Sequence, residues 1–232
     1  MLLTVARAGA SLAIVAAFVI AGCSSPSPGP PSPDGGPEAG PDGADATEET
    51  DCPVGFLGDE GGAPAFDIQI LEADESVAQI ADGASVPMIL PPQGGRVIFV
   101  GVHATNVDGC ELQLTGALRD LTTQEVRVDS RTINLIDTHD GYGVSGLPNT
   151  SVSSAITNFS NVALCPNEWS PTNIYGTQYG LEVTIQDREG RQVTNKIKVT
   201  PECGQPENLD QCLCICKGGY VLGESCGDGG DE

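Results

Sequence analysis

The sequence predicts an all-β protein built as an antiparallel β-sandwich of about seven strands. From about residue 63 to residue 202, apolar residues recur at every second position, which is the period of a strand with one buried face. Clusters of Gly, Asn, Asp and Pro separate the apolar segments, as turns separate strands. No stretch of this region combines an apolar period of 3.6 residues with helix caps, so no helix is expected in it.

The expected strands differ in the strength of their patterns. Residues 97–102 form a continuous apolar run, which predicts a strand buried on both faces. Residues 179–185 and 193–199 alternate most regularly, and the turn 187–190 between them predicts a hairpin. One weaker segment changes phase near Thr132, which predicts a β-bulge. The weaker segments are 66–70, 110–118, 126–135 and 152–164.

The sandwich domain is expected over residues 52–202. Its strand count and length resemble those of immunoglobulin and fibronectin type III modules, and this resemblance implies two sheets packed face to face. The chain departs from true immunoglobulin domains because Trp169 follows Cys165 and does not lie between two paired cysteines. The order of the strands in the sheets therefore stays open.

Residues 1–22 have the features of a signal peptide. Arg7 precedes an uncharged run over residues 8–21 that is rich in Ala, Val and Ile. A run of this length fits the hydrophobic region of a signal peptide, whereas a membrane-spanning helix needs about 20 apolar residues. The segment is therefore expected to be removed on export.

The apolar run ends in Ile20-Ala21-Gly22-Cys23, which resembles the lipobox of bacterial lipoproteins. The resemblance implies a diacylglyceryl group on the Cys23 thiol, cleavage just before Cys23, and acylation of the new N-terminus by a fatty acid such as palmitate. Ile20 stands where leucine is commonest in the family. Ser24 follows the cysteine, which implies sorting to the outer membrane, on its periplasmic or its surface side. The alternative is an ordinary signal peptide followed by an incidental cysteine.

The segment 23–51 is expected to be a disordered tether. Residues 24–50 contain seven prolines together with Gly, Ser and acidic residues, and no Ile, Leu, Val or aromatic residue. Such a composition offers too little apolar surface to offset the loss of conformational entropy on folding. The tether would hold the folded part clear of the membrane.

The charge of the chain excludes one class of partner. Asp and Glu number 32 against 10 Lys and Arg, which gives a net charge of −22. Nucleic acid is therefore not an expected partner, because its phosphates would be repelled. Anionic lipid would be repelled as well, so membrane attachment is expected through acyl chains on Cys23 only.

Nine cysteines indicate an oxidising compartment. Lipidation of Cys23 would leave eight, an even number, and four disulfides are expected among them. A zinc site is the alternative, but the Cys-x-Cys spacing in the tail is tighter than the usual Cys-x₂₋₄-Cys. Residues 203–232 are expected to form a small disulfide-rich tail, and the connectivity stays open. The eight are Cys52, Cys110, Cys165, Cys203, Cys212, Cys214, Cys216 and Cys226.

The sequence contains no recognisable catalytic motif, and no cofactor is expected. His103 lies in an expected strand, and His139 lies in a Gly-containing loop between Asp137 and Asp140. The two aspartates could bind Ca²⁺ or orient a base, although Asp-Gly sequences are also ordinary turn chemistry. Ser145 lies in Gly143-Val144-Ser145-Gly146, which lacks the G-x-S-x-G pattern of a nucleophile elbow.

Three aromatic residues, Trp169, Tyr175 and Tyr179, cluster around a loop between expected strands. Aromatic rings on a loop could stack on a sugar or anchor a protein partner. The structural alternative is that Trp169 fills one end of the sandwich.

These features favour a non-enzymatic, membrane-anchored lipoprotein that presents a β-sandwich for interaction or envelope structure. The possible partners are an envelope or extracellular protein, or a glycan. The first alternative is a carbohydrate- or calcium-binding surface module, and the second is an extracytoplasmic hydrolase whose site has no recognisable motif. A sandwich fold by itself does not choose among them.

Overall fold

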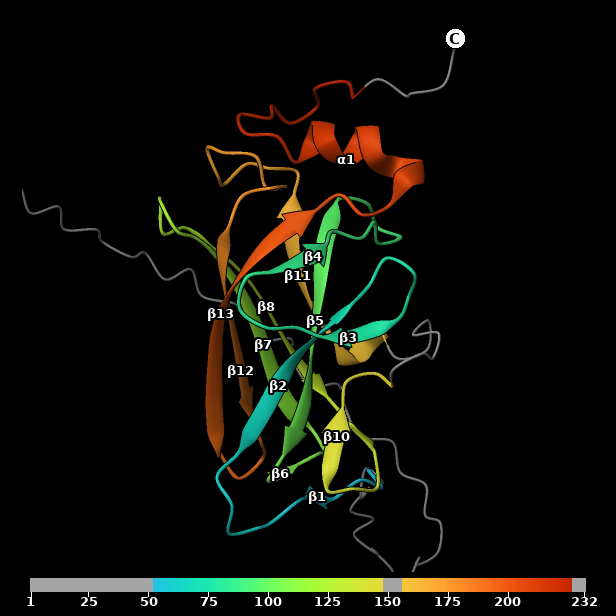
Figure 1. Ribbon diagram of the computed structural model, residues 1–232, viewed down its shortest axis with the longest axis vertical. Coiled ribbons are helices and arrows are strands. Elements are labelled where there is room, and N and C mark those ends of the chain that lie inside the picture. Colours follow the sequence, from blue (N-terminus) through green and yellow to red (C-terminus); the bar gives the residue numbers. More distant parts are fainter. Residues whose placement is uncertain (1–51, 148–155, 227–232) are drawn as a thin grey trace, which may run out of the picture. The chain divides into compact units, whose positions relative to one another are not determined.

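Two β-sheets pack face to face in the part of the chain that the structure, a computed structural model, describes, namely residues 52–147 and 156–226 (Figure 1). These residues contain thirteen strands, of which five have only two or three residues. The eight longer strands are close to the seven expected, and the predicted all-β sandwich is confirmed. The segments expected to form the signal peptide, the lipobox and the tether, residues 1–51, lie outside the described residues.

The first sheet has β5 at its centre. β2 pairs with β5 on one side, and β10 and β11 pair with it on the other, all antiparallel. The strand order is β3-β2-β5-β10-β9, with β11 also beside β5. The bounds are β2 (Ala65–Leu71), β3 (Val77–Gln79), β5 (Arg96–Thr105), β9 (Ile136–Asp137), β10 (Tyr142–Val144) and β11 (Ser160–Cys165).

The second sheet contains the hairpin that the sequence predicts most clearly. β12 and β13 pair antiparallel from Tyr179↔Val199 to Gln186↔Gln192. The strand order is β4-β13-β12-β7-β8. One pairing differs from the antiparallel prediction: β4 runs parallel to β13, because it arrives from the first sheet and not through a hairpin. The bounds are β4 (Ala84–Pro87), β7 (Leu112–Asp120), β8 (Val126–Ile133), β12 (Tyr179–Gln186) and β13 (Gln192–Glu202).

The predicted bulge near Thr132 is wrong. β8 pairs with β7 in unbroken register from Leu112↔Ile133 to Arg119↔Val126. β8 is the last strand of its sheet, and Val128 on it is 59% exposed. The apolar residues of β8 therefore need not all point toward the core, and a change in their alternation does not require a bulge. The register shift that does occur lies in β11, between Ala163 and Cys165.

The core lies between the two sheets and is dense with aliphatic side chains. Alternate residues of β7 and β12 are completely buried, as the alternation predicts. Gly116 in β7 allows the sheets to approach closely, since a Cβ there would lie 2.7 Å from Ser160 Oγ of β11. The buried hydrophobic residues of the two strands are Leu112, Leu114, Leu118, Tyr179, Leu181, Val183 and Ile185.

A two-stranded ribbon lies at one end of the sandwich, where the described chain begins. β1 (Phe56–Leu57) pairs with β6 (Val107–Asp108). The Cys52–Cys110 disulfide joins the same two segments. The first described residues are therefore fixed to the sandwich covalently as well as by strand pairing.

The cysteine-rich segment forms a helical cap at the opposite end (Figure 1). The short 3₁₀ helix η3 (Pro206–Asn208) leads into α1 (Leu209–Ile215). Cys212 and Cys214 lie within α1, and Cys216 directly follows it. Cys212 and Cys216 are buried with the main core, and the described residues 52–147 and 156–226 belong to one compact unit. Residues 203–226 are thus part of the sandwich unit.

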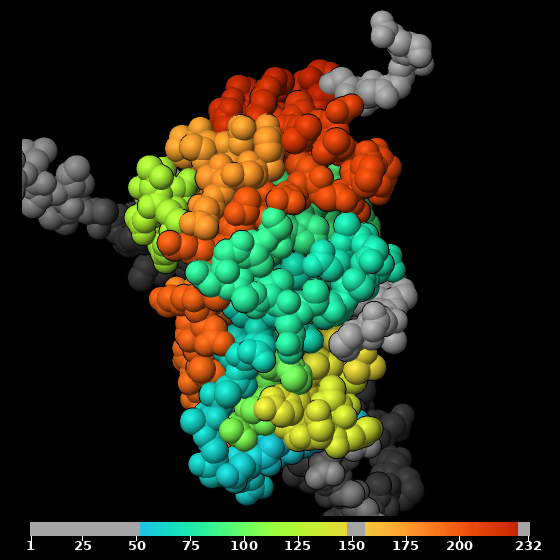
Figure 2. Space-filling model, in the orientation of Figure 1, coloured from blue at the N-terminus to red at the C-terminus, as the bar shows by residue number. Residues whose placement is uncertain are grey.

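All eight described cysteines form disulfides, as predicted. Besides Cys52–Cys110 the bonds are Cys165–Cys216, Cys203–Cys212 and Cys214–Cys226. Figure 2 shows that the cap and the neighbouring segment 166–178 form one continuous surface at this end. Neither this helix nor any other described helix is long and apolar enough to cross a membrane.

Candidate functional site

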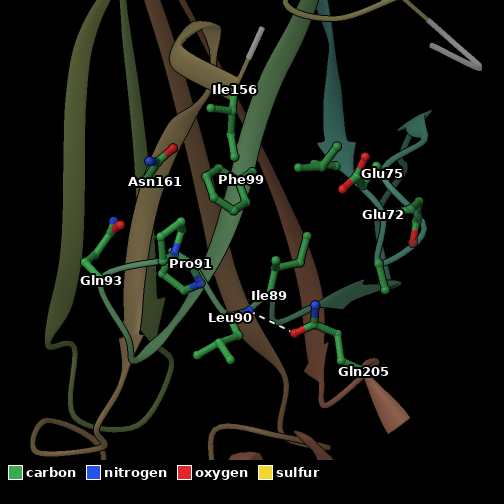
Figure 3. Close-up of a pocket in the computed structure, with 13 residues that line it drawn as sticks. Glu72, Glu75, Ile89, Leu90, Pro91, Gln93, Phe99, Ile156, Asn161 and Gln205 are labelled. Atoms are coloured by element: carbon green, nitrogen blue, oxygen red, sulfur yellow. Dashed lines mark hydrogen bonds between the residues drawn. The ribbon is translucent and has the colours of Figure 1, made fainter. Parts of the chain in front are cut away.

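A groove of about 510 Å³ lies on the outer face of the first sheet. Phe99 of β5 and Ile89 form its middle (Figure 3). Pro91 and Gln93 lie on one side, and the turn that carries Glu72 and Glu75 lies on the other. The volume is within the range of sites that hold small molecules or short peptide segments.

The groove has an apolar floor because β5 is hydrophobic on both faces. Ile98 and Val100 point into the main core, while Val97 and Phe99 join a second cluster on the outer face. This arrangement confirms the prediction that the run 97–102 is buried on both faces. The second cluster also contains Leu71, Val77 and Phe159, with Ile89 and Ile156 packed against it at the edge.

One wall of the groove is acidic. The turn between β2 and β3 is closed by a hydrogen bond from Glu72 N–H to Ser76 C=O of 2.8 Å. Asp74 Oδ1 accepts hydrogen bonds from the Ser76 N–H and hydroxyl, at 3.0 and 2.6 Å. Partial burial raises the pKa of the Glu72 carboxyl, and the charge of Asp74 raises it further. The groove is lined by two glutamates and by no Lys, Arg or His.

The opposite wall is fixed to the cap. Gln205 Oε1 accepts hydrogen bonds from Leu90 N–H at 2.9 Å and from Arg96 Nη1 at 2.7 Å. Pro91 and Pro92 restrict the backbone of the same wall. The groove is therefore bounded by preformed segments on both sides.

The aromatic candidates Trp169 and Tyr179 are part of the core. Their exposed fractions are 7% and 0%, and their ring centroids lie 5.5 Å apart. Trp169 Nε1 donates to Leu164 C=O at 2.9 Å. Tyr175 is half-buried against the core. This packing favours the structural alternative, in which Trp169 fills one end of the sandwich.

Tyr179 ends in a buried polar network. Its hydroxyl donates to Ser170 Oγ at 3.0 Å, and Ser170 Oγ donates to Asp120 Oδ2 at 2.7 Å. Burial raises the pKa of the Tyr179 hydroxyl. Burial also opposes ionisation of Asp120, but hydrogen bonds from Ser170 and from the backbone of Thr122 and Thr123 outweigh it and lower the pKa of Asp120. The network fixes the start of β12 against the end of β7.

Asp137 and Asp140 accept hydrogen bonds from donors in their own loop. Asp137 accepts from His139 N–H at 2.7 Å, and its other oxygen lies 3.0 Å from His139 Nδ1. Asp140 Oδ1 accepts from the Thr138 hydroxyl at 2.5 Å, which lowers the pKa of Asp140. Within residues 52–147 and 156–226, no group of three or more His, Cys, Asp or Glu residues is arranged to hold a metal ion.

The remaining catalytic candidates have structural partners. Ser145 is completely buried, and its Oγ accepts the Val102 N–H at 3.0 Å. His103 Nδ1 lies 2.7 Å from Gln79 Nε2, and its ring stacks on Tyr142. The structure brings none of these groups into the groove.

The groove was not predicted from the sequence, although one signal for it is present. A strand that is apolar on both faces needs cover on both, and only partial cover of the outer face leaves a groove. No protein-family model, curated protein or solved structure matches the chain.

Proposed function

We propose that the chain is a non-enzymatic, membrane-anchored lipoprotein that binds a segment of an envelope or extracellular protein in the groove of the first sheet. The groove is the observation that supports this proposal, because it combines an apolar floor, an open mouth and preformed walls. Apolar grooves with a few polar groups at the rim are typical of binding sites.

The chemistry of the groove defines the kind of segment it would bind. Phe99, Ile89 and Ile156 supply apolar contacts, and Glu72 and Glu75 supply negative charge on one wall. An apolar side chain flanked by lysine or arginine is complementary to both features. The excess of acid over the whole chain would attract the same partner from a distance.

The N-terminal region would place this groove in the envelope. Acyl chains on Cys23 would hold the protein on the membrane, and the proline-rich tether would extend by at most roughly 80 Å at about 3.1 Å per residue. A groove carried on such a tether could reach partners at a range of distances and orientations.

The lipid anchor is tested by mass spectrometry of the mature protein. We expect an N-terminal peptide that begins at Cys23 and carries the mass of a diacylglyceryl group and an amide-linked acyl chain. A Cys23→Ala variant should keep its signal peptide or leave the membrane fraction. An unmodified Cys23 in the mature wild-type protein would contradict the anchor without bearing on the groove.

The binding site is tested by photo-crosslinking in cells. We expect a photoreactive phenylalanine at position 93, an exposed residue of the groove wall, to give a discrete protein adduct. Ile156→Asp should reduce the yield of this adduct about tenfold, which corresponds to about 1.4 kcal/mol of binding free energy. The measurement is the adduct intensity on a denaturing gel.

The matched control places the same photoreactive residue at position 192, which is exposed on the second sheet. No adduct of the same mass should form there. Equal adducts at positions 93 and 192, or an adduct that Ile156→Asp leaves unchanged, would contradict binding in the groove.

A further inference from the structure

Two disulfides converge on one face of α1. Cys212 and Cys216 lie four residues apart on the helix, and their sulfur atoms are 4.0 Å from each other. Cys212 is bonded to Cys203, just after β13, and Cys216 is bonded to Cys165, the last residue of β11. The two bonds are the covalent links between this helix and the strands.

The two bonds differ in accessibility. Cys165 and Cys216 are 5% and 0% exposed, so an external thiol cannot reach either sulfur of their bond. Cys203 is half-buried, whereas its partner Cys212 is 1% exposed. A thiol from solvent therefore attacks this pair at Cys203, and the sulfur that leaves is that of Cys212.

A buried cation lies at the first turn of the helix that carries Cys212. Arg96 is completely buried and is the cross-strand neighbour of Cys165. Its guanidinium donates to Asn208 C=O at 2.8 Å and to Gln211 Oε1 at 3.2 Å, which places it at the first turn of α1. Its Nε has no hydrogen-bond partner. A neighbouring positive charge stabilises thiolates and so favours thiol–disulfide exchange.

We infer that α1 carries a thiol–disulfide exchange site whose substrate is a dithiol. The dithiol reduces Cys203–Cys212 and leaves as a disulfide, giving two electrons and two protons to the protein. The Cys212 thiolate then attacks Cys216 Sγ and displaces Cys165 as a thiolate, which takes up the proton that Cys212 lost. The product has thiols at Cys165 and Cys203 and a Cys212–Cys216 bond within the helix.

The exchange has a structural consequence. One two-electron reduction removes both covalent links between α1 and the strands, because the second link opens without further reductant. The cap is then held by non-covalent contacts, among them those of Arg96 with Gln205, Asn208 and Gln211.

The test is limited reduction of the full chain with dithiothreitol under native conditions. The reaction is quenched with acid, free thiols are alkylated, and the bonds are mapped by mass spectrometry. Among molecules with two alkylated cysteines in the set 165, 203, 212 and 216, we expect labels on Cys165 and Cys203 to predominate. Labels on Cys203 and Cys212, with Cys165–Cys216 intact, would overturn the inference.

A second measurement removes the attacking sulfur. In the double variant Cys203→Ser, Cys212→Ser, labelling of Cys165 should slow at least about tenfold at the same dithiothreitol concentration. The Cys214–Cys226 bond, with both cysteines half-buried, provides an internal reference for access of the reagent. An unchanged rate at Cys165 would overturn the inference. If the variant does not fold, the bond map of the wild-type chain decides alone.

Discussion

Replacing Trp169 with alanine is expected to lower the free energy of unfolding by about 3–5 kcal/mol, because a large buried aromatic side chain would leave a cavity. The indole is 7% exposed, packs on Tyr179 and donates to Leu164 C=O. The loss of this hydrogen bond adds to the cost of the cavity, since the acceptor stays buried. Urea denaturation of the oxidised protein gives the value.

The matched control is Tyr142→Ala, in which a partly exposed aromatic residue is removed. Tyr142 is 37% exposed and stacks on His103, so we expect a loss of less than about 1 kcal/mol. Trp169→Ala should also leave the adduct at position 93 unchanged, provided that the variant is folded. A small change in stability together with loss of a ligand would restore the hypothesis that Trp169 binds a sugar or a protein.

The long strands could be predicted because their burial follows from local pattern. The residues of β12 alternate between the core and the outside, and its pairing with β13 follows from a short turn. β5 could be predicted for the opposite reason, since a strand covered on both faces has no polar positions to alternate. The partner strand of β12 is adjacent to it in sequence, and the burial of β5 is almost uniform along the strand. Both features are therefore visible in the local sequence.

The cap could not be predicted in the same way. α1 has only seven residues and lacks a side-chain hydrogen bond at its N-cap, so local signals for a helix are weak. It is held by bonds to residues as far away as Cys165, and by Arg96 more than one hundred positions earlier. Such contacts depend on which strands end near one another, which the hydrophobic pattern does not encode.

The groove and the aromatic cluster show that sites are also hard to predict from the sequence when they depend on contacts between distant segments. Trp169 and Tyr179 are close in sequence, and their rings also contact each other in the structure. Whether they face solvent depends on the loop around them, which folds inward through Asn167 and Ser170. The groove, in turn, combines Glu72, Phe99 and Gln205 from separate parts of the chain.

Replacing Arg96 with alanine is expected to be among the most destabilising single changes, with a loss of about 3–5 kcal/mol. The guanidinium donates to Gln205 Oε1, Asn208 C=O and Gln211 Oε1. Alanine would remove all three bonds and leave a cavity, with Gln205 Oε1 keeping only its bond from Leu90 N–H. Arg96→Lys should recover only part of the loss, because one ammonium group cannot reproduce the planar fork that spans three acceptors. Urea denaturation with the four disulfides intact measures each variant.

Burying the positive charge of Arg96 costs desolvation free energy, which opposes the gain from its hydrogen bonds. A third variant, Arg96→Met, measures the balance of the two. Burial lowers the pKa of Arg96, and Glu207 opposes this lowering only in part, so the cation carries an uncompensated desolvation penalty. Arg96→Met keeps the apolar stem and removes both the penalty and the hydrogen bonds. We expect it to be less stable than wild type, since two of the three acceptor residues, Gln205 and Asn208, are only partly accessible to water. A more stable Arg96→Met would show that desolvation outweighs the hydrogen bonds.

Arg188→Ala is the control for the Arg96 variants, because it breaks an exposed ion pair with Asp108. It should lower the free energy of unfolding by less than about 1 kcal/mol.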